Sequence, residues 1–257
     1  MRKNYWTRYE LVWLICFCGL AAFITVLTRE GPFGFFVFLS GVLCVILVAK
    51  GSIVNYAAGM FNTVGYAWIA WHNGLFGEVW LNLAFYFPMN IIGLVLWSRH
   101  LQKDRKDIVR MLKMTRKGLI LTAVICAVST AGLGYALSLI PTQNTPYIDA
   151  ATTALSVIAT ILMVRRYREQ WVCYITLNIL TVIMWGIRWA AGSPDGLLMV
   201  VMWSAYLINA VYGYNNWTRG ANADANAKAD AIANMDTRRS TNTEANINTD
   251  AEMEVSK

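Results

Sequence analysis

The sequence predicts an all-α polytopic membrane protein with eight transmembrane helices. Of its 257 residues, 57% are hydrophobic and only 14% are charged, whereas a soluble domain has about 25% charged residues. Eight apolar stretches of 17 to 23 residues follow one another along the chain, and about 20 helical residues cross the hydrocarbon core of a bilayer. Two parts of the chain also repeat each other. The composition therefore argues against a soluble enzyme or a soluble nucleic-acid-binding protein.

The apolar stretches give the expected helices in chain order. They cover residues 11–28, 33–49, 53–71, 79–97, 118–140, 147–164, 171–191 and 197–217. Basic residues precede the first stretch, but no small-residue cleavage site follows it, so we expect a retained helix rather than a signal peptide. Pro88 predicts a bend within 79–97, either a hinge or a static kink. Residues 218–257 are polar and contain no aromatic residue, so a disordered cytoplasmic tail is expected.

The positions of the basic residues predict the orientation. With a cytoplasmic N-terminus, 20 of the 22 Lys and Arg residues fall in cytoplasmic segments, and only Arg29 and Arg188 fall outside them. The largest group lies between residues 99 and 117. The positive-inside rule then places both termini in the cytoplasm. These clusters are interpreted as topology signals with a secondary role on anionic lipid headgroups, and nucleic acid is not an expected partner.

Two triplets of helices are predicted from an internal repeat. Asn62 and Asn178 recur at an offset of 116 residues, and Asn90 and Asn209 recur at an offset of 119 residues. The triplets occupy 33–97 and 147–217, and one helix within 98–146 separates them. An odd number of helices between equivalent positions keeps the two triplets parallel. With an extra N-terminal helix in 1–32, the expected arrangement is 1+3+1+3, which suits alternating access around a central site.

The predicted membrane interior lacks ionisable groups at depth. No Asp or Glu lies near the centre of a span, and coupled carriers usually place an ionisable group there, so facilitated diffusion is the simplest interpretation. No Lys or Arg lies at mid-depth to bind a phosphate. The five cysteines have no metal-binding spacing. We expect no catalytic residue, metal or cofactor.

Amide and aromatic side chains are the candidate ligands of a central site. Buried amides either bind a ligand or join helices, and tryptophans near helix ends are usually interface anchors. Trp71, Trp80, Trp97, Trp171, Trp189 and Trp217 fit the anchor interpretation. The candidate substrate-binding residues are Asn62, Trp68, Tyr86, Asn90, Asn178, Trp185, Trp203, Tyr206, Asn209 and Tyr212. Aromatic rings with nearby amides suit a flat, cationic ring that carries hydroxyls, such as a nucleoside-like vitamin.

Residues 169–217 resemble the C-terminal signature of the PnuC family of bacterial vitamin transporters. The resemblance is carried by Glu169-Gln-Trp171, Asn178, Trp185 and the run 203–217, and it extends more weakly over 33–217. It implies a SWEET-like fold, often a homotrimer in the bacterial inner membrane. The implied activity is uptake of nicotinamide riboside by facilitated diffusion, followed by trapping through cytoplasmic phosphorylation. A carrier for thiamine or another vitamin, a SWEET-like sugar carrier and a non-transporting scaffold remain alternatives.

Overall fold

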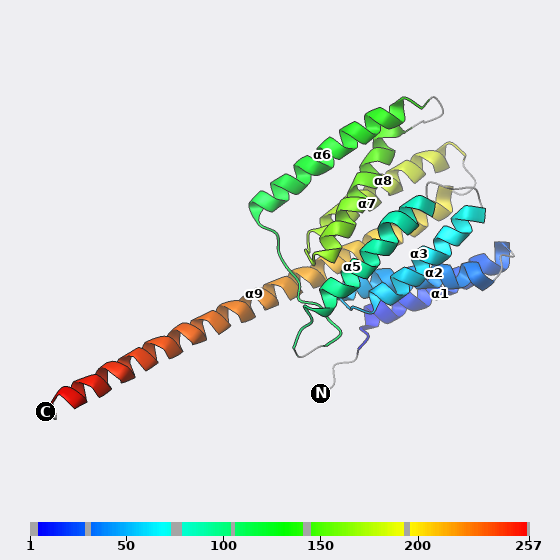
Figure 1. Cartoon of the computed structure of the whole chain (residues 1–257). Helices are drawn as coiled ribbons and strands as arrows, with labels where there is room; N and C mark the ends of the chain where they lie inside the picture. The colour runs from blue at the N-terminus through cyan, green and yellow to red at the C-terminus, as the bar shows by residue number, and fades with distance from the viewer. Residues whose placement is uncertain are drawn as a thin grey trace.

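The computed structural model describes residues 5–28, 32–72, 79–103, 106–140, 145–192 and 196–255, and these residues form an all-helical bundle (Figure 1). Each expected span has a helix that begins within a few residues of its predicted start, and all but the last also end within a few residues of the predicted end. The elements are α1 (Arg8–Thr28), α2 (Pro32–Lys50), α3 (Asn55–His72), η1 (Leu81–Tyr86), α5 (Phe87–Ser98), α6 (Arg116–Ser138), α7 (Pro146–Val164), α8 (Gln170–Ala190) and α9 (Gly196–Val255).

Five of the described helical segments are long and apolar enough to cross a membrane. They are Pro32–Lys50, Leu81–Ser98, Arg116–Ser138, Pro146–Val164 and Gln170–Ile187. Helix α6 is the least buried of them, with 6% of its most apolar window buried. A surface that remains this apolar without protein cover is suited to lipid. The prediction of an all-α membrane protein is therefore confirmed.

Local sequence explains where several helices begin and end. The N–H of Thr7 donates to Oε2 of Glu10 (2.8 Å) and the N–H of Glu10 donates to Oγ1 of Thr7 (3.2 Å), which forms a capping box at the start of α1. Thr115 caps α6 by accepting from the N–H of Gly118. Gly51, with a φ of 77°, ends α2 in the left-handed conformation that glycine adopts without strain.

Pro88 lies two residues after the end of a π-helical segment. The segment η1 ends at Tyr86, and the N–H of Phe87 donates to the carbonyl of Asn82 five residues earlier. Pro88 has no N–H, so it cannot make the α-helical bond to the carbonyl four residues before it. The wider π-helical turn is a typical local adjustment to such an interruption. The expected bend in span 79–97 therefore has a backbone cause at this position.

The repeat predicts two triplets of helices, with α1 and α6 outside them. The first triplet is α2, α3 and η1–α5, and the second is α7, α8 and α9. The triplets meet where α2 packs on α9 and where α5 packs on α7. Helix α1 packs on α2, and α6 packs on α7 (Figure 1). Each outer helix therefore contacts the first helix of a triplet.

One end of the bundle, called here the basic end, is closed by the segment 99–115, called the basic segment. Short bridges join Ser52 to Ile108 and Leu112 to Tyr167. The basic segment is thereby fixed to the loops that follow α2 and α7, one from each triplet. Its apolar residues Ile108, Val109 and Met111 are buried. Its described basic residues Arg99, Lys103, Lys106, Arg110 and Lys113 are exposed.

The structure differs from the disorder expected for 218–257, because α9 continues without interruption to Val255. This part of the chain is rich in alanine, the strongest helix former, and contains no proline. Its first turns also contact the bundle. Ala221 is buried, and Oδ2 of Asp224 accepts a hydrogen bond from the N–H of Met111 at 2.9 Å. The extension therefore begins as a packed element beneath the basic end.

The two triplets repeat the same backbone contacts at a fixed offset. The N–H of Gly51 donates to the carbonyl of Val48 (2.9 Å), and the N–H of Arg166 donates to the carbonyl of Met163 (2.8 Å). Both donors have positive φ, 77° and 66°. The equivalent positions are 115 residues apart. This offset relates α2 to α7 and α3 to α8.

A second offset relates the third helices of the triplets. A Cβ on Gly93 would collide with the ring of Tyr56, and a Cβ on Gly213 would collide with the ring of Trp171. Tyr56 and Trp171 are 115 residues apart, whereas the two glycines are 120 residues apart. Each glycine lets an aromatic ring from the second helix of its own triplet pack against its backbone.

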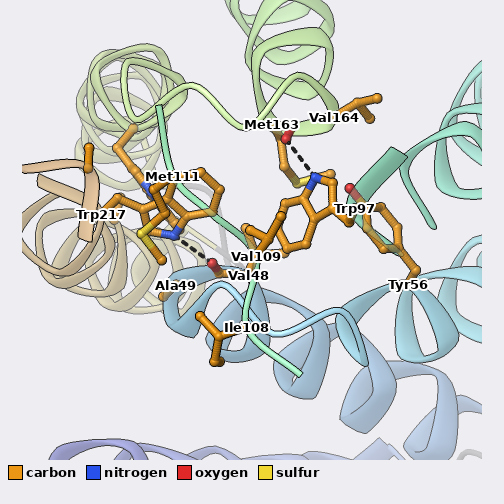
Figure 2. Close-up of a cluster of buried hydrophobic side chains, with 13 residues drawn as sticks. Val48, Ala49, Tyr56, Trp97, Ile108, Val109, Met111, Met163, Val164 and Trp217 are labelled. Atoms are coloured by element: carbon orange, nitrogen blue, oxygen red, sulfur yellow. Dashed lines mark hydrogen bonds between the residues drawn. The ribbon is translucent and has the colours of Figure 1, made fainter. Parts of the chain in front are cut away.

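Three tryptophans that were expected to be interface anchors are core residues instead. Trp97, Trp171 and Trp217 are buried in one cluster at the basic end with Val109 and Met111 of the basic segment (Figure 2). The rings of Trp97 and Trp217 lie 5.7 Å apart. By contrast Trp71, Trp80 and Trp189 are exposed, as interface anchors are. Both roles place a tryptophan near a helix end, so the sequence pattern could not distinguish them.

A candidate substrate-binding cavity

A cavity of about 660 Å³ is lined by residues of both triplets. This volume lies in the usual range for small-molecule sites. Seven of the ten candidate residues line it. They are Asn62, Tyr86, Asn90, Asn178, Trp203, Tyr206 and Asn209. The packing of the triplets therefore brings most of the candidate set to one place, although the residues are spread over 148 positions of the chain.

The other three candidates lie outside the residues that line this cavity. Trp68 is 60% exposed and lines a separate apolar depression formed by residues of α2, α3 and α5. Trp185 lies on α8 seven residues after Asn178, about two helical turns further from the basic end. The hydroxyl of Tyr212 donates to Oε1 of Glu10 at 3.1 Å. Tyr212 therefore belongs to the packing of the basic end.

Two glycines make room for two of the amides. A Cβ on Gly41 would lie 2.8 Å from Nδ2 of Asn62, and a Cβ on Gly59 would lie 2.8 Å from Oδ1 of Asn90. Asn62 Nδ2 donates to the carbonyl of Val37 at 2.8 Å, which holds the amide against α2. These amides therefore join helices and line the cavity at the same time.

The side chain of Asn90 is held by two hydrogen bonds. Its Nδ2 donates to the carbonyl of Tyr86 (3.0 Å) and to Oγ1 of Thr63 (3.2 Å). Both amide hydrogens are thus used within the protein, and Oδ1 remains as the acceptor of the side chain. Asn209 donates more weakly, to the carbonyl of Val45 at 3.4 Å.

The amides are not structural equivalents of one another. Helices α3 and α8 are uninterrupted, so the offset of 115 pairs Asn178 with Thr63 rather than with Asn62. The offset of 120 likewise pairs Asn90 with Ala210. The recurrence of asparagine at 116 and 119 residues is therefore one residue out of register in each case. The two sides of the cavity carry different polar groups.

Aromatic side chains supply a further wall of the cavity. The rings of Trp203 and Tyr206 meet edge to face at 5.6 Å. Phe17 of α1 stacks parallel to Tyr206 at 6.3 Å from outside the triplet. A ring that is held by a second ring has little rotational freedom left to lose when a ligand binds. Trp203 and Tyr206 are therefore the described aromatic pair best placed to stack on a flat ligand.

Several hydroxyl-bearing residues of the cavity were missed in the sequence. Ser156 and Thr160 of α7 and Tyr174 of α8 line the cavity. The hydroxyl of Tyr86 lies 2.6 Å from Oγ of Ser156, which joins η1 of the first triplet to α7 of the second. Such residues are common in transmembrane helices, so only their position relative to the repeat could have indicated them. Asn82 also lines the cavity.

All of the cavity-lining side chains that the structure describes are neutral. Among the described residues, no group of three His, Cys, Asp or Glu side chains could hold a metal ion. The cavity therefore offers amides, hydroxyls and aromatic faces to a ligand.

A buried charge pair lies outside the cavity, at the basic end. Glu10 and Lys50 are both buried, with Oε2 and Nζ 3.2 Å apart. The ammonium group of Lys50 also lies 3.7 Å from the ring centre of Tyr5 and 4.4 Å from that of Trp6. Glu10 accepts from Tyr212 of α9 as well. This carboxylate links α1 to both triplets.

Comparisons with known proteins agree on one family. A family model described as nicotinamide mononucleotide transporter matches residues 31–219. A nicotinamide riboside transporter PnuC from Neisseria mucosa is 34% identical, over 83% of this chain and 82% of the relative. The PnuC of Haemophilus influenzae is 36% identical, over 83% and 91%. A crystal structure of the vitamin B3 transporter PnuC superposes with a TM-score of 0.70 at 32% identity, over 86% of this chain and 95% of that chain.

Proposed function

This chain belongs to the nicotinamide mononucleotide transporter family, which agrees with the expectation that it is not an enzyme, and on this premise we propose that it takes up nicotinamide riboside across the bacterial inner membrane. The observation that carries the proposal is the neutral cavity of amides, hydroxyls and aromatic rings between the triplets. A pyridinium ring can be held by an aromatic face without a formal negative charge. Ribose and carboxamide groups can donate to and accept from the hydroxyls and amides.

The riboside is preferred over the mononucleotide because of the charge of the cavity. A phosphate group that leaves water needs cationic partners, and Arg or Lys usually supplies them. Each of the cavity-lining side chains in the described chain is neutral. The relatives in Neisseria mucosa and Haemophilus influenzae are likewise named for the riboside. Thiamine is also a cationic aromatic molecule, so the relatives rather than the cavity favour nicotinamide riboside over it.

Transport is proposed to be facilitated diffusion. The buried carboxylates that the structure describes at the basic end, Glu10 and Glu169, are paired with Lys50 and Arg168 and lie outside the cavity. A structural ion pair of this kind does not provide a site where a proton crosses with the cargo. Phosphorylation of the riboside by a cytoplasmic kinase would then make uptake one-way.

Alternating access is proposed to occur between the two triplets in the 1+3+1+3 arrangement. Two halves that share equivalent contacts can exchange a closed end for an open end by rocking around a central site. The recurring backbone bonds at offsets of 115 residues support this arrangement. From the positive-inside rule we propose that the basic end and both termini lie in the cytoplasm. A homotrimer is proposed from the family resemblance alone.

Uptake into proteoliposomes tests the proposal. Purified protein should admit labelled nicotinamide riboside down its gradient, and unlabelled riboside should compete better than thiamine, glucose or the mononucleotide. Imposed pH or Na⁺ gradients should produce no accumulation above equilibrium. Stronger competition by thiamine than by the riboside would show that the cargo is thiamine or another vitamin. Accumulation driven by an ion gradient would contradict facilitated diffusion. Empty proteoliposomes provide the control.

A further inference from the structure

The two sides of the cavity differ at positions that the repeat makes equivalent. At the offset of 115 residues, Gly41 corresponds to Ser156, and Val45 corresponds to Thr160. All four residues line the cavity. The first triplet therefore has no hydroxyl at two positions where the second triplet has one.

The largest difference is at the position shared by Gly59 and Tyr174. Both residues line the cavity. In the first triplet the space beside Gly59 is taken by Asn90. In the second triplet the residue equivalent to Asn90 is Ala210, and the phenol ring of Tyr174 replaces the hydrogen of the glycine. Large and small residues have exchanged places between the halves.

These differences create two chemically distinct walls. The amide wall consists of Asn62 and Asn90, which lie against Gly41 and Gly59. The hydroxyl wall consists of Ser156, Thr160 and Tyr174. Oγ1 of Thr160 donates to the backbone carbonyl of Ser156 at 2.8 Å, and the hydroxyl of Ser156 lies 2.6 Å from that of Tyr86.

Hydrogen-bonding capacity remains on both walls. On the hydroxyl wall, the phenol of Tyr174 lines the cavity and carries one O–H donor and an oxygen that can accept hydrogen bonds. On the amide wall, Oδ1 of Asn90 is an acceptor. A carboxamide pairs with an amide by donating and accepting, whereas ribose hydroxyls donate well to another hydroxyl oxygen.

We propose that Tyr174 is a specificity-determining residue that accepts a hydrogen bond from the ribose hydroxyls of the cargo, so that the cargo binds in one orientation with its carboxamide at the amide wall. This inference rests on nicotinamide riboside being the cargo. The pseudo-symmetric cavity would otherwise admit the cargo in two opposite orientations. Tyr174 removes one of them because its phenol ring lines the second-triplet side at the position where the first triplet has Gly59 and the amide of Asn90.

Calorimetry on purified, monodisperse protein tests this role with two ligands. They are nicotinamide riboside and its 2′,3′-dideoxy analogue, which keeps the ring and the carboxamide. Tyr174→Phe keeps the aromatic ring and should weaken riboside binding about tenfold, while binding of the analogue changes less than twofold. Thr160→Val, which copies the first-triplet residue, should show the same pattern with a smaller loss.

Tyr56→Phe is the matched control. It removes the same hydroxyl from a buried tyrosine of α3 that does not line the cavity, so binding of both ligands should stay unchanged. Equal losses for both ligands in Tyr174→Phe, or no loss for the riboside, would overturn the inference while leaving the proposed cargo in place. Wild-type protein that binds no riboside would overturn the proposed function together with the inference.

Discussion

The indole Nε1 of Trp97 donates a hydrogen bond to the carbonyl oxygen of Met163 at 3.1 Å. The reciprocal bond runs from Nε1 of Trp217 to the carbonyl of Val48 at 2.8 Å (Figure 2). Each bond joins the last helix of one triplet to the first helix of the other. Val48 and Met163 also line the cavity. The basic end cannot open between the triplets without breaking both bonds.

Trp97→Phe should therefore make the cavity more accessible from the basic end. A buried hydrogen bond contributes about 1 kcal/mol, which corresponds to roughly a fivefold shift in population. Cys44 lines the cavity and can report on it once the other cysteines are replaced by serine. A membrane-impermeant maleimide should label it about five times faster from the basic side. Trp80→Phe, at an exposed indole, should leave the rate unchanged, and equal rates in both variants would contradict the prediction.

Glu10→Gln should lower thermal stability markedly. Breaking a buried ion pair by removing one partner costs about 3–5 kcal/mol, because the other charge stays buried without compensation. The double variant with Lys50→Met should recover part of the loss. Melting of the purified protein in detergent measures both effects. A double variant that is less stable than Glu10→Gln would show that Lys50 acts mainly through the rings of Tyr5 and Trp6.

Gly51→Ala should destabilise the protein more than Arg166→Gly. Gly51 has a φ of 77° and Arg166 has a φ of 66° at the equivalent position. An L-residue in this conformation costs about 1–2 kcal/mol, and an alanine at 51 would also collide with Met111. Glycine at 166 relieves strain while losing only an exposed hydrogen bond to Arg110. Equal melting temperatures for the two variants would contradict this comparison.

Trp203→Ala should weaken riboside binding more than Trp185→Ala. Trp203 lines the cavity, whereas Trp185 lies outside the lining residues. Loss of a desolvated cation–π contact costs about 2 kcal/mol, or roughly thirtyfold in affinity. Calorimetry on each folded variant gives the comparison, and Trp203→Phe should be milder. A larger loss of riboside affinity in Trp185→Ala would show that the stacking site lies further from the basic end.

Cysteines introduced at Thr145 and Asp250 should be labelled from opposite sides of the membrane. The split of 20 against 2 basic residues predicts that residue 250 is cytoplasmic and that residue 145 is outside. In intact cells, an impermeant maleimide should label Thr145→Cys only. Permeabilised cells control for reactivity. Labelling of Asp250→Cys in intact cells would reverse the assigned orientation.

The helices were predictable because hydrophobic length is a local property of the chain. Packing at the ends of the helices was not, because it depends on partners far away in the sequence. Trp97 and Trp217 resemble interface anchors until the two triplets meet. Tyr174 gives no signal in the sequence, since its role depends on Gly59 at the equivalent position. The sequence repeat aligned the asparagines one residue out of register. It matched identical residue types, whereas structural equivalence is defined by backbone contacts.

The bond between Trp217 and Val48 joins residues 169 positions apart. During synthesis, α2 emerges from the ribosome long before α9, so the carbonyl of Val48 has no indole partner until translation nears its end. The contact of Asp224 with Met111 forms later still. Closure of the basic end is therefore a late event in biogenesis. The first helices of a nascent chain therefore insert without these contacts, and the basic end closes only after the last helix has been synthesised.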